Sequence, residues 1–144
     1  MSPVEVRREI RRVAGDLVGI VRREETLCQA LERLATLREE ASRQKVRDPH
    51  LAYNRELVEA LQNENMLDVL EAVVRASLRR QESRGAMYRP DYPITDDDNW
   101  LCNVVVRKQG GEYVLETRPV AEKWMSLPRG TRRYGQKGGA AAGV

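Results

Sequence analysis

The residues most able to do chemistry lie between positions 82 and 100, where arginines, carboxylates and tyrosines alternate with glycine and proline. The stretch reads Glu-Ser-Arg-Gly-Ala-Met-Tyr-Arg-Pro-Asp-Tyr-Pro-Ile-Thr-Asp-Asp-Asp-Asn-Trp. Arginine forks bind carboxylates and carbonyls through paired hydrogen bonds, so they suit a polar interface that must be held in register. The same arginines could instead only pin this arm to its own helices, and the residues alone leave both interpretations open.

Other candidate sites are weaker. Asp96, Asp97 and Asp98 could hold a hard cation, but adjacent acids on an extended chain point in different directions, and no glycine-bearing calcium loop surrounds them. We interpret them as a solvated loop or as partners for arginines. His50 is the only histidine and lies beside a helix start, so we interpret it as solvated. Ser83 has no histidine base within sequence reach, which argues against a serine nucleophile.

Composition indicates one soluble domain with a modest core. The chain has 144 residues, of which 41% are hydrophobic, 33% charged and only 5% aromatic, so a large aromatic-lined substrate pocket is not expected. There is no apolar run of about 18 residues that would predict a membrane span, and the N-terminus lacks a signal-peptide pattern. Cys28 and Cys102 predict reduced thiols rather than a disulfide or a zinc site.

Charge gives little support for nucleic-acid binding. The net charge is +3 and the isoelectric point about 9.1. Four arginines occur within 7–12, but acids interleave with them over 5–16, which favours a solvated, ion-paired helix face over a phosphate-binding one. No dinucleotide fingerprint is present, and the glycines near the C-terminus match no phosphate-binding loop.

Three amphipathic helices are predicted before residue 86. Ser2 is a candidate cap, followed by apolar residues at helical spacing, namely Val6, Ile10, Val13, Leu17 and Val21. The second helix runs from Glu24 to about Lys45, on a stripe of leucines at 27, 31, 34 and 37. The third runs over 55–84, after start signals at Asp48-Pro49 and at Asn54. Its apolar positions are Leu57, Leu61, Leu67, Leu70, Val74 and Leu78. Gly85 after three nearby arginines predicts its end.

The character of the chain changes after residue 86. Two prolines exclude helix locally. Residues 100–108 read as a strand, 109–111 as a turn and 112–117 as the returning strand. Such a hairpin is marginally stable alone and needs a surface beneath it.

The predicted fold is therefore mainly α: a three-helix bundle followed by an extended arm with one β-hairpin. We expect an antiparallel bundle over 1–85, an arm over 86–134 that packs on the bundle within the same domain, and a flexible tail over 135–144.

The order of motifs in the arm resembles the C-terminal region of the succinate dehydrogenase and fumarate reductase flavoprotein subunits. The shared motifs are Glu82-Ser83-Arg84-Gly85-Ala86-Met87, Arg89-Pro90-Asp91, Asp96-Asp97 and Trp100-Leu101. Further similarity lies at Val18-Gly19-Ile20-Val21-Arg22, Asn54, Leu57, Asn65-Met66-Leu67, Leu115-Glu116-Thr117-Arg118-Pro119-Val120, Leu127-Pro128 and Arg132-Arg133-Tyr134. The resemblance thus covers residues 5–134 in the family's order.

This resemblance implies an architectural domain of a larger flavoenzyme, without an active site, metal or cofactor of its own. The full-length subunit would carry FAD and interconvert succinate and fumarate. Implied partners are the flavin-binding and capping domains of the same subunit and an iron–sulfur subunit, with no nucleic acid and no direct membrane insertion. The implied location is cytoplasmic and peripheral to the inner membrane. Interface residues implied by the motifs are Glu82, Ser83, Arg84, Met87, Arg89, Asp91, Arg118, Arg132 and Arg133.

Some departures and alternatives bear on this reading. Met87 stands where the family has histidine, and a thioether carries no proton. The L-aspartate oxidases are similar only through the Ser-Arg-Gly block, so residues 100–134 favour a respiratory-complex subunit; the motifs do not separate dehydrogenase from reductase. The alternatives from other classes are a free-standing helical protein-interaction module and a weak nucleic-acid binder.

Overall fold

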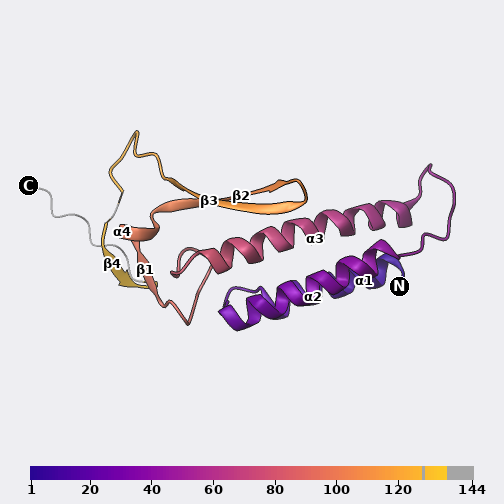
Figure 1. Cartoon of the computed structure of the whole chain (residues 1–144), viewed down its shortest axis with the longest axis horizontal. Coiled ribbons are helices and arrows are strands. Elements are labelled where there is room, and N and C mark those ends of the chain that lie inside the picture. Colours follow the sequence, from indigo (N-terminus) through magenta and orange to yellow (C-terminus); the bar gives the residue numbers. More distant parts are fainter. Residues whose placement is uncertain (128, 136–144) are drawn as a thin grey trace, which may run out of the picture. The chain divides into compact units, whose positions relative to one another are not determined.

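The computed structural model describes residues 1–127 and 129–135. The predicted tail, except for Gly135, lies outside the described residues. Helix is the main secondary structure, and it is accompanied by a β-hairpin and a small second sheet (Figure 1). The prediction of a mainly α fold with one hairpin is confirmed.

The chain forms two compact units. The first comprises residues 1–19 and 24–75, and it is helical. The second comprises residues 20–23 and the described residues from 76 onward, and it contains every strand assigned in the described chain.

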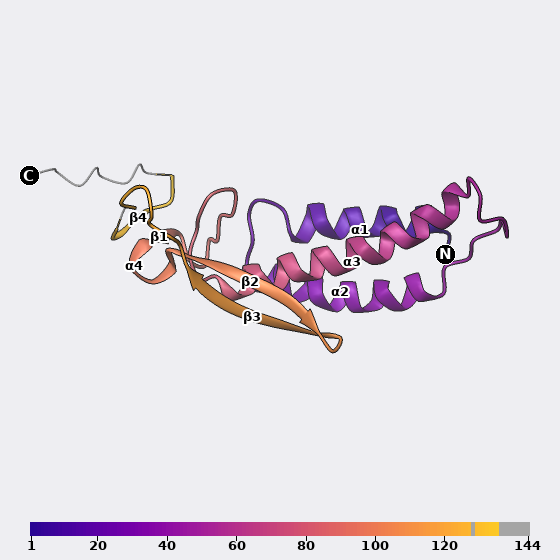
Figure 2. The ribbon, with the colours of Figure 1, turned by 90° about the horizontal axis from the view of Figure 1, so that it is seen from above.

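The first unit is built from α1 (Pro3–Leu17), α2 (Glu24–Ser42) and most of α3 (Arg55–Arg79), which lie side by side in Figure 2. Position 9 contacts 33 and position 1 contacts 45, while position 44 contacts 60 and position 38 contacts 68, so α2 runs antiparallel to both neighbours. The helices bury one apolar core, made by Val6, Ile10, Val13, Leu27, Ala30, Leu34, Leu37, Ala41, Ala60, Leu67 and Val74.

Two of the predicted helix starts are present. Ser2 and Glu5 form a reciprocal capping box at the start of α1, with Pro3 in the first turn. Asn54 caps α3, since its Oδ1 accepts from the backbone N–H of Leu57 at 2.9 Å. His50 is exposed in the loop before this cap, as expected.

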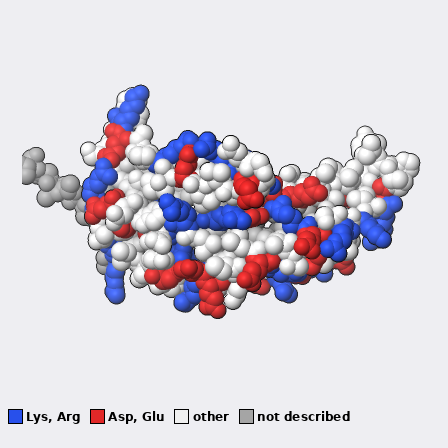
Figure 3. All heavy atoms as spheres, viewed as in Figure 1, with Lys and Arg blue, Asp and Glu red and all other residues white. Residues whose placement is uncertain are grey.

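Basic and acidic side chains are interleaved on the face shown in Figure 3. Within the first unit, Arg38 pairs with Asp68 at 2.8 Å and with Glu71 at 2.9 Å. Arg12 lies 3.8 Å from Glu9, one turn away on α1. The Arg12–Glu9 pair is of the kind that the interleaved charges over 5–16 predicted, and such exposed pairs contribute little to stability.

The first helix ends earlier than its apolar spacing predicted. α1 stops at Leu17, and Val21 is 56% exposed instead of extending the buried stripe. Residues 20–23 leave the helix to pair with Tyr88: the Arg22 N–H donates to the Tyr88 carbonyl at 2.8 Å, and the Tyr88 N–H donates to the Ile20 carbonyl at 2.9 Å. Backbone pairing within the second unit therefore replaces the last turn of helix.

The prediction that α3 runs to residue 84 is wrong. The helix ends at Arg79, and Gly85 is not its cap. Arg84 and Met87 instead exchange backbone hydrogen bonds of 2.9 and 3.0 Å around a two-residue turn whose first residue, Gly85, has φ 59°. A glycine after arginines fits a helix end and a tight turn equally well, because both require positive φ.

The core of α3 also differs from the predicted stripe. Leu61 is 54% exposed, whereas Asn63 is fully buried. The Asn63 side chain donates to the Pro3 carbonyl at 2.7 Å and to Gln44 at 3.3 Å, so its burial is compensated. Apolar spacing cannot reveal a core position occupied by a hydrogen-bonded amide.

The second unit holds the strands. β2 (Cys102–Gln109) pairs antiparallel with β3 (Glu112–Pro119) through Gly110-Gly111, both of which have positive φ. This is the predicted hairpin, although its first strand begins at Cys102 rather than at Trp100. Not predicted are a short antiparallel pair, β1 (Ile94–Asp96) with β4 (Thr131–Arg133), and the single turn of α4 (Asp97–Trp100).

Candidate functional site

The most polar buried region lies in the second unit, where α3 ends and β1, α4 and β4 meet. We call Arg80, Glu82, Arg84, Asp97 and Arg132 the arginine–carboxylate cluster. Its two carboxylate side chains have no exposed surface, while its three arginine side chains are between 14% and 29% exposed. It is therefore a set of buried acids enclosed by partly exposed bases.

Glu82 is the acid nearest the helix end. Its Oε1 accepts from Arg84 Nε at 2.7 Å and from Arg80, and its Oε2 accepts from the Asp96 backbone N–H at 2.8 Å. Arg80 in turn donates to the carbonyls of Trp100 and Cys102, at 2.9 and 2.5 Å. These bonds tie the end of α3 to α4 and to the start of β2.

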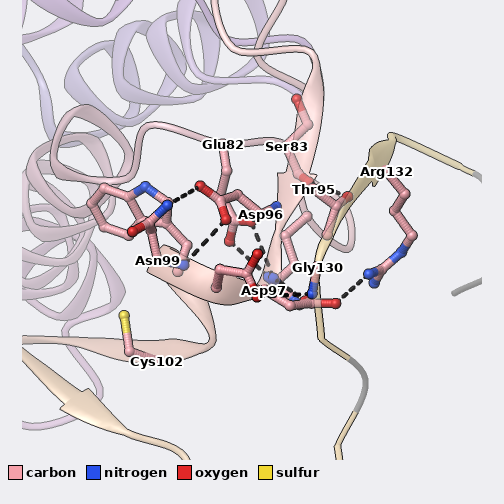
Figure 4. Close-up of polar contacts among 12 residues, drawn as sticks. Glu82, Ser83, Thr95, Asp96, Asp97, Asn99, Cys102, Gly130 and Arg132 are labelled. Carbon is pink, nitrogen blue, oxygen red and sulfur yellow. Dashed lines mark hydrogen bonds and ion pairs between the residues drawn. The ribbon is translucent and has the colours of Figure 1, made fainter. Parts of the chain in front are cut away.

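Asp97 is the second acid, at the start of α4. Its carboxylate accepts from Arg84 at 2.6 Å and from Arg132 of β4, toward which it points in Figure 4. Burial opposes its ionisation, but the hydrogen bonds from Arg132 and Arg84 outweigh that effect and lower the pKa of Asp97. The hydrogen bonds that Arg84 donates to Glu82 raise its pKa, and the one to Asp97 adds to this effect. Burial lowers the pKa but by less than these bonds raise it.

Arg89 is a separate buried cation, only 1% exposed. It binds Asp91 through Nε at 2.9 Å and through Nη2 at 2.5 Å, and donates to the Ser77 carbonyl at 2.6 Å. The guanidinium also lies over the ring of Tyr92, 5.0 Å from its centroid. Arg89 thus fastens the arm to the C-terminal end of α3, where backbone carbonyls lack helical partners.

Ser83 organises the backbone of the arm. Its Oγ accepts from the Arg89 N–H at 2.8 Å and lies 2.8 Å from the Tyr92 carbonyl. Its own carbonyl accepts from Thr95 Oγ1 at 2.7 Å. The hydroxyl therefore holds the backbone of the loop.

Met87 lies at the turn closed by Gly85. Its side chain helps line a cavity of about 460 Å³ together with Arg80, Arg84 and Trp100. Tyr134, the residue after β4, also holds the turn, because its hydroxyl donates a hydrogen bond to the Gly85 carbonyl at 2.5 Å. A thioether fills space beside these groups and adds no proton donor.

Two of the implied interface arginines do not join these groups. Arg118 is on β3, where it pairs with Glu116 and is 58% exposed. Arg133 is exposed on β4. The sequence alone did not separate these two from Arg84, Arg89 and Arg132.

Three residues that make these buried contacts were not predicted to be interface residues. Arg80 resembled an ordinary helix-end cation, and Thr95 carried no signal. Asp97 was visible as the middle of an acidic triplet, and its pairing with arginines was one of the two interpretations offered. Its neighbours differ, since Asp96 caps α4 and Asp98 accepts from the Gly130 N–H at 3.0 Å.

The arrangement suits structural work rather than acid–base chemistry. Its carboxylates are held by arginines, which do not release protons in the physiological range. Within the described residues, no group of three or more potential ligands could hold a metal ion. No described helix combines the length and apolarity needed to cross a bilayer.

Comparison with known proteins identifies the family. Residues 7–134 match the family described as "Fumarate reductase flavoprotein C-term". The chain belongs to this family, the C-terminal domain of succinate dehydrogenase and fumarate reductase flavoprotein subunits.

Individual relatives agree. The chain is 37% identical over 122 residues to the succinate dehydrogenase flavoprotein subunit of Coxiella burnetii, covering 85% of this chain and 20% of the relative. It is 34% identical over 134 residues to the fumarate reductase flavoprotein subunit of Mycobacterium tuberculosis, covering 92% and 22%.

Solved structures show the same fold. A Mycobacterium smegmatis Sdh1 complex matches with a TM-score of 0.76 and 35% identity, covering 83% of this chain and 20% of that one. An E. coli quinol fumarate reductase matches with a TM-score of 0.80 and 27% identity, covering 89% and 22%. The chain thus spans about a fifth of the length of these relatives.

Proposed function

We propose that this chain is the architectural C-terminal domain of a flavin-dependent succinate dehydrogenase or fumarate reductase, with no active site of its own. In the full-length subunit, FAD and the reacting centre belong to the part outside this chain. Its role is to cover the flavin-bearing part and to fix contacts between subunits.

One observation carries the proposal. The acids of the arginine–carboxylate cluster are completely buried, and every described partner of Asp97 and Glu82 is an arginine or a backbone N–H. Such groups hold segments in register but offer no proton at neutral pH. The density of arginine and carboxylate in the arm is thus explained by positioning rather than by catalysis.

The proposed partners are those that the family resemblance implies. They are the flavin-binding and capping domains of the same subunit and an iron–sulfur subunit, in a complex peripheral to the cytoplasmic face of the inner membrane. Glu82, Ser83, Arg84, Met87, Arg89, Asp91, Arg118, Arg132 and Arg133 are proposed to form or support these contacts. Arg118 and Arg133, which are exposed, would face a partner directly, while the buried residues would hold the surface in shape.

The test is Arg84→Ala in a full-length subunit that carries this sequence. We expect reduced flavin content and reduced co-purification of the iron–sulfur subunit, with turnover per bound flavin unchanged. Losing a hydrogen-bond partner of a buried charge costs about 1.5–3 kcal/mol, which is enough to loosen an interface. Arg43→Ala is the control, because Arg43 is 75% exposed and pairs only with Glu39 among the described residues.

Normal assembly with a collapse in turnover per flavin would place Arg84 in the chemistry and refute the architectural role. A folded chain that does not join such a complex would favour the interaction-module alternative.

A further inference from the structure

An apolar groove runs between α1 and α3 in the first unit. Its volume is about 520 Å³, and its apolar lining comes from Ile10, Ala14, Met66, Val69, Leu70 and Val73. The two helices that flank it run in the same direction, since both are antiparallel to α2. A groove between two aligned helices has the shape that accepts a further helix along its length.

The outer wall of the groove continues as an exposed apolar stripe on α3. Val58, Leu61, Val69 and Val73 are 51%, 54%, 64% and 37% exposed. Their spacing puts them along one side of the helix. Contiguous apolar surface of this kind marks an interaction site more often than isolated exposed side chains do.

The polar part of the lining is basic. Arg7 and Arg11 of α1 lie on one side, Gln62 and Asn65 on the other, and no acidic residue of the described chain lines the groove. Arg7 is occupied by Glu59 and Gln62. Arg11 is exposed and forms no ion pair with any described residue, so a carboxylate of a bound partner would complement it.

We propose that this groove is the docking site for an amphipathic helix that carries an acidic side chain opposite Arg11. The helix is supplied by the flavin-bearing part of the subunit, so the proposal rests on the proposed function. The solved relatives leave room for such a partner, because this chain matches only 20% and 22% of their length. The partner's apolar face would cover Val69 and Val73, and its carboxylate would fix the register.

The experiment is a labelling footprint on a fusion in which this chain replaces the matched region of the Coxiella burnetii succinate dehydrogenase flavoprotein subunit. In a Cys28→Ser, Cys102→Ser background, Val69→Cys places a thiol in the groove. Leu51→Cys places one in the loop before α3, at a residue that is 83% exposed. Maleimide labelling rates are read by peptide mass spectrometry in the fusion and in the isolated chain. Leu61→Cys gives a second reading on the stripe.

We expect Val69→Cys to label at least tenfold more slowly in the fusion than in the isolated chain, and Leu51→Cys to label within twofold in both. Equal rates for Val69→Cys overturn the proposal. If flavin is retained in that case, the proposed function stands and only the groove assignment fails; if flavin is lost as well, both fail. Protection that appears in the isolated chain on raising its concentration would make a second copy the occupant and also overturn the proposal.

The acidic partner is tested separately. In the fusion, Arg11→Glu should raise the labelling rate of Val69→Cys at least fivefold. Arg8→Glu is the matched control, since Arg8 is exposed on the same helix but does not line the groove. Equal effects of the two substitutions would overturn the assignment of a carboxylate opposite Arg11.

Discussion

At the scale of single residues, buried charge is the main feature that this chain must accommodate. The Asp97 side chain has no exposed surface, yet its pKa is lower than that of an ordinary aspartate because two guanidinium groups donate to it. Burying a carboxylate without such partners would be strongly unfavourable. Arg84 and Arg132 therefore make the position of α4 depend on both the end of α3 and β4.

Asp97→Asn should destabilise the fold at pH 7 by about 2 kcal/mol. A fully buried pair that loses one partner costs ~3–5 kcal/mol, but Arg84 and Arg132 remain 29% and 20% exposed and can be hydrated. Urea unfolding measures the change, with Asp16→Asn as the control, since Asp16 is exposed on α1. An equal loss in both variants would contradict the role given to Asp97.

The same pair predicts a pH dependence. The pKa of Asp97 is lower in the folded state than its ordinary value, so the unfolded chain binds this proton more readily. The stabilisation is complete above the unfolded pKa of about 3.9 and is lost as the pH falls through the folded value. The free-energy difference between parent and Asp97→Asn should therefore shrink below about pH 4. A difference that stays constant from pH 7 to pH 3 would show that the carboxylate charge is not the cause.

At the scale of elements, glycine has opposite effects in α1 and in the turn after α3. A methyl group at Gly85 would meet no atom within 4 Å, but its φ of 59° strains any L side chain. Gly15 lies within α1 and is equally open, without a positive φ. We expect Gly85→Ala to lower the free energy of unfolding by about 1–2 kcal/mol and Gly15→Ala to raise it by about 0.5–1 kcal/mol. Thermal unfolding of the two variants checks the signs, and destabilisation by both would mean that the helical assignment around Gly15 is at fault.

The helical unit should also persist without the arm. The buried residues of α1 and α2, with Leu67 and Val74 of α3, all belong to the first unit. We expect a chain of residues 1–85 to keep most of its far-ultraviolet helical signal, at reduced stability, because the partners of Arg80 and Glu82 beyond residue 85 are lost. Complete loss of helix in this truncated chain would show that residues 86–134 belong to the same folding unit.

Local rules explain how much could be predicted from the sequence. The capping box at Ser2, the cap at Asn54 and the Gly110-Gly111 turn were readable because each depends on residues close together in the chain. The β1–β4 pair joins residues 94–96 to 131–133 and has no local signature. The early ends of α1 and α3 are likewise set by tertiary partners, since residues 20–23 pair with Tyr88 and Ser83 pairs with Ile94.

The sequence predicted the type of contact in the candidate site, but not which residues make it. The density of arginine and carboxylate indicated buried polar contacts. Arg84 and Arg132 meet at Asp97, while Arg89 forms a separate pair with Asp91. Which arginine meets which acid depends on how β4 returns to α4, and that is not encoded in spacing. Arg118 and Arg133 could not be told from Arg132 in the sequence, but they are exposed. The position of each residue in its strand decides which side chain faces inward.

At the scale of the whole molecule, the role proposed for this chain is to hold surfaces rather than to react. The first unit offers an apolar groove with a basic rim, and the second offers an arm stiffened by buried ion pairs. Under the proposed function, both features serve contacts with the part of the subunit outside this chain. That fits a chain that spans about a fifth of its relatives' length.

The purified chain should accordingly be colourless and inactive. Succinate–fumarate chemistry belongs to a flavin, and a protein supplies its binding, orientation and electrostatics. The network that dominates the second unit consists of arginines and acids that already satisfy one another, so it offers neither a dinucleotide cradle nor a proton relay. The visible spectrum after mixing with excess FAD and gel filtration, together with dye-linked succinate oxidation, measures both properties. A stoichiometric yellow complex that oxidises succinate would mean that residues 1–144 contain the reacting centre, and the architectural role would then be withdrawn.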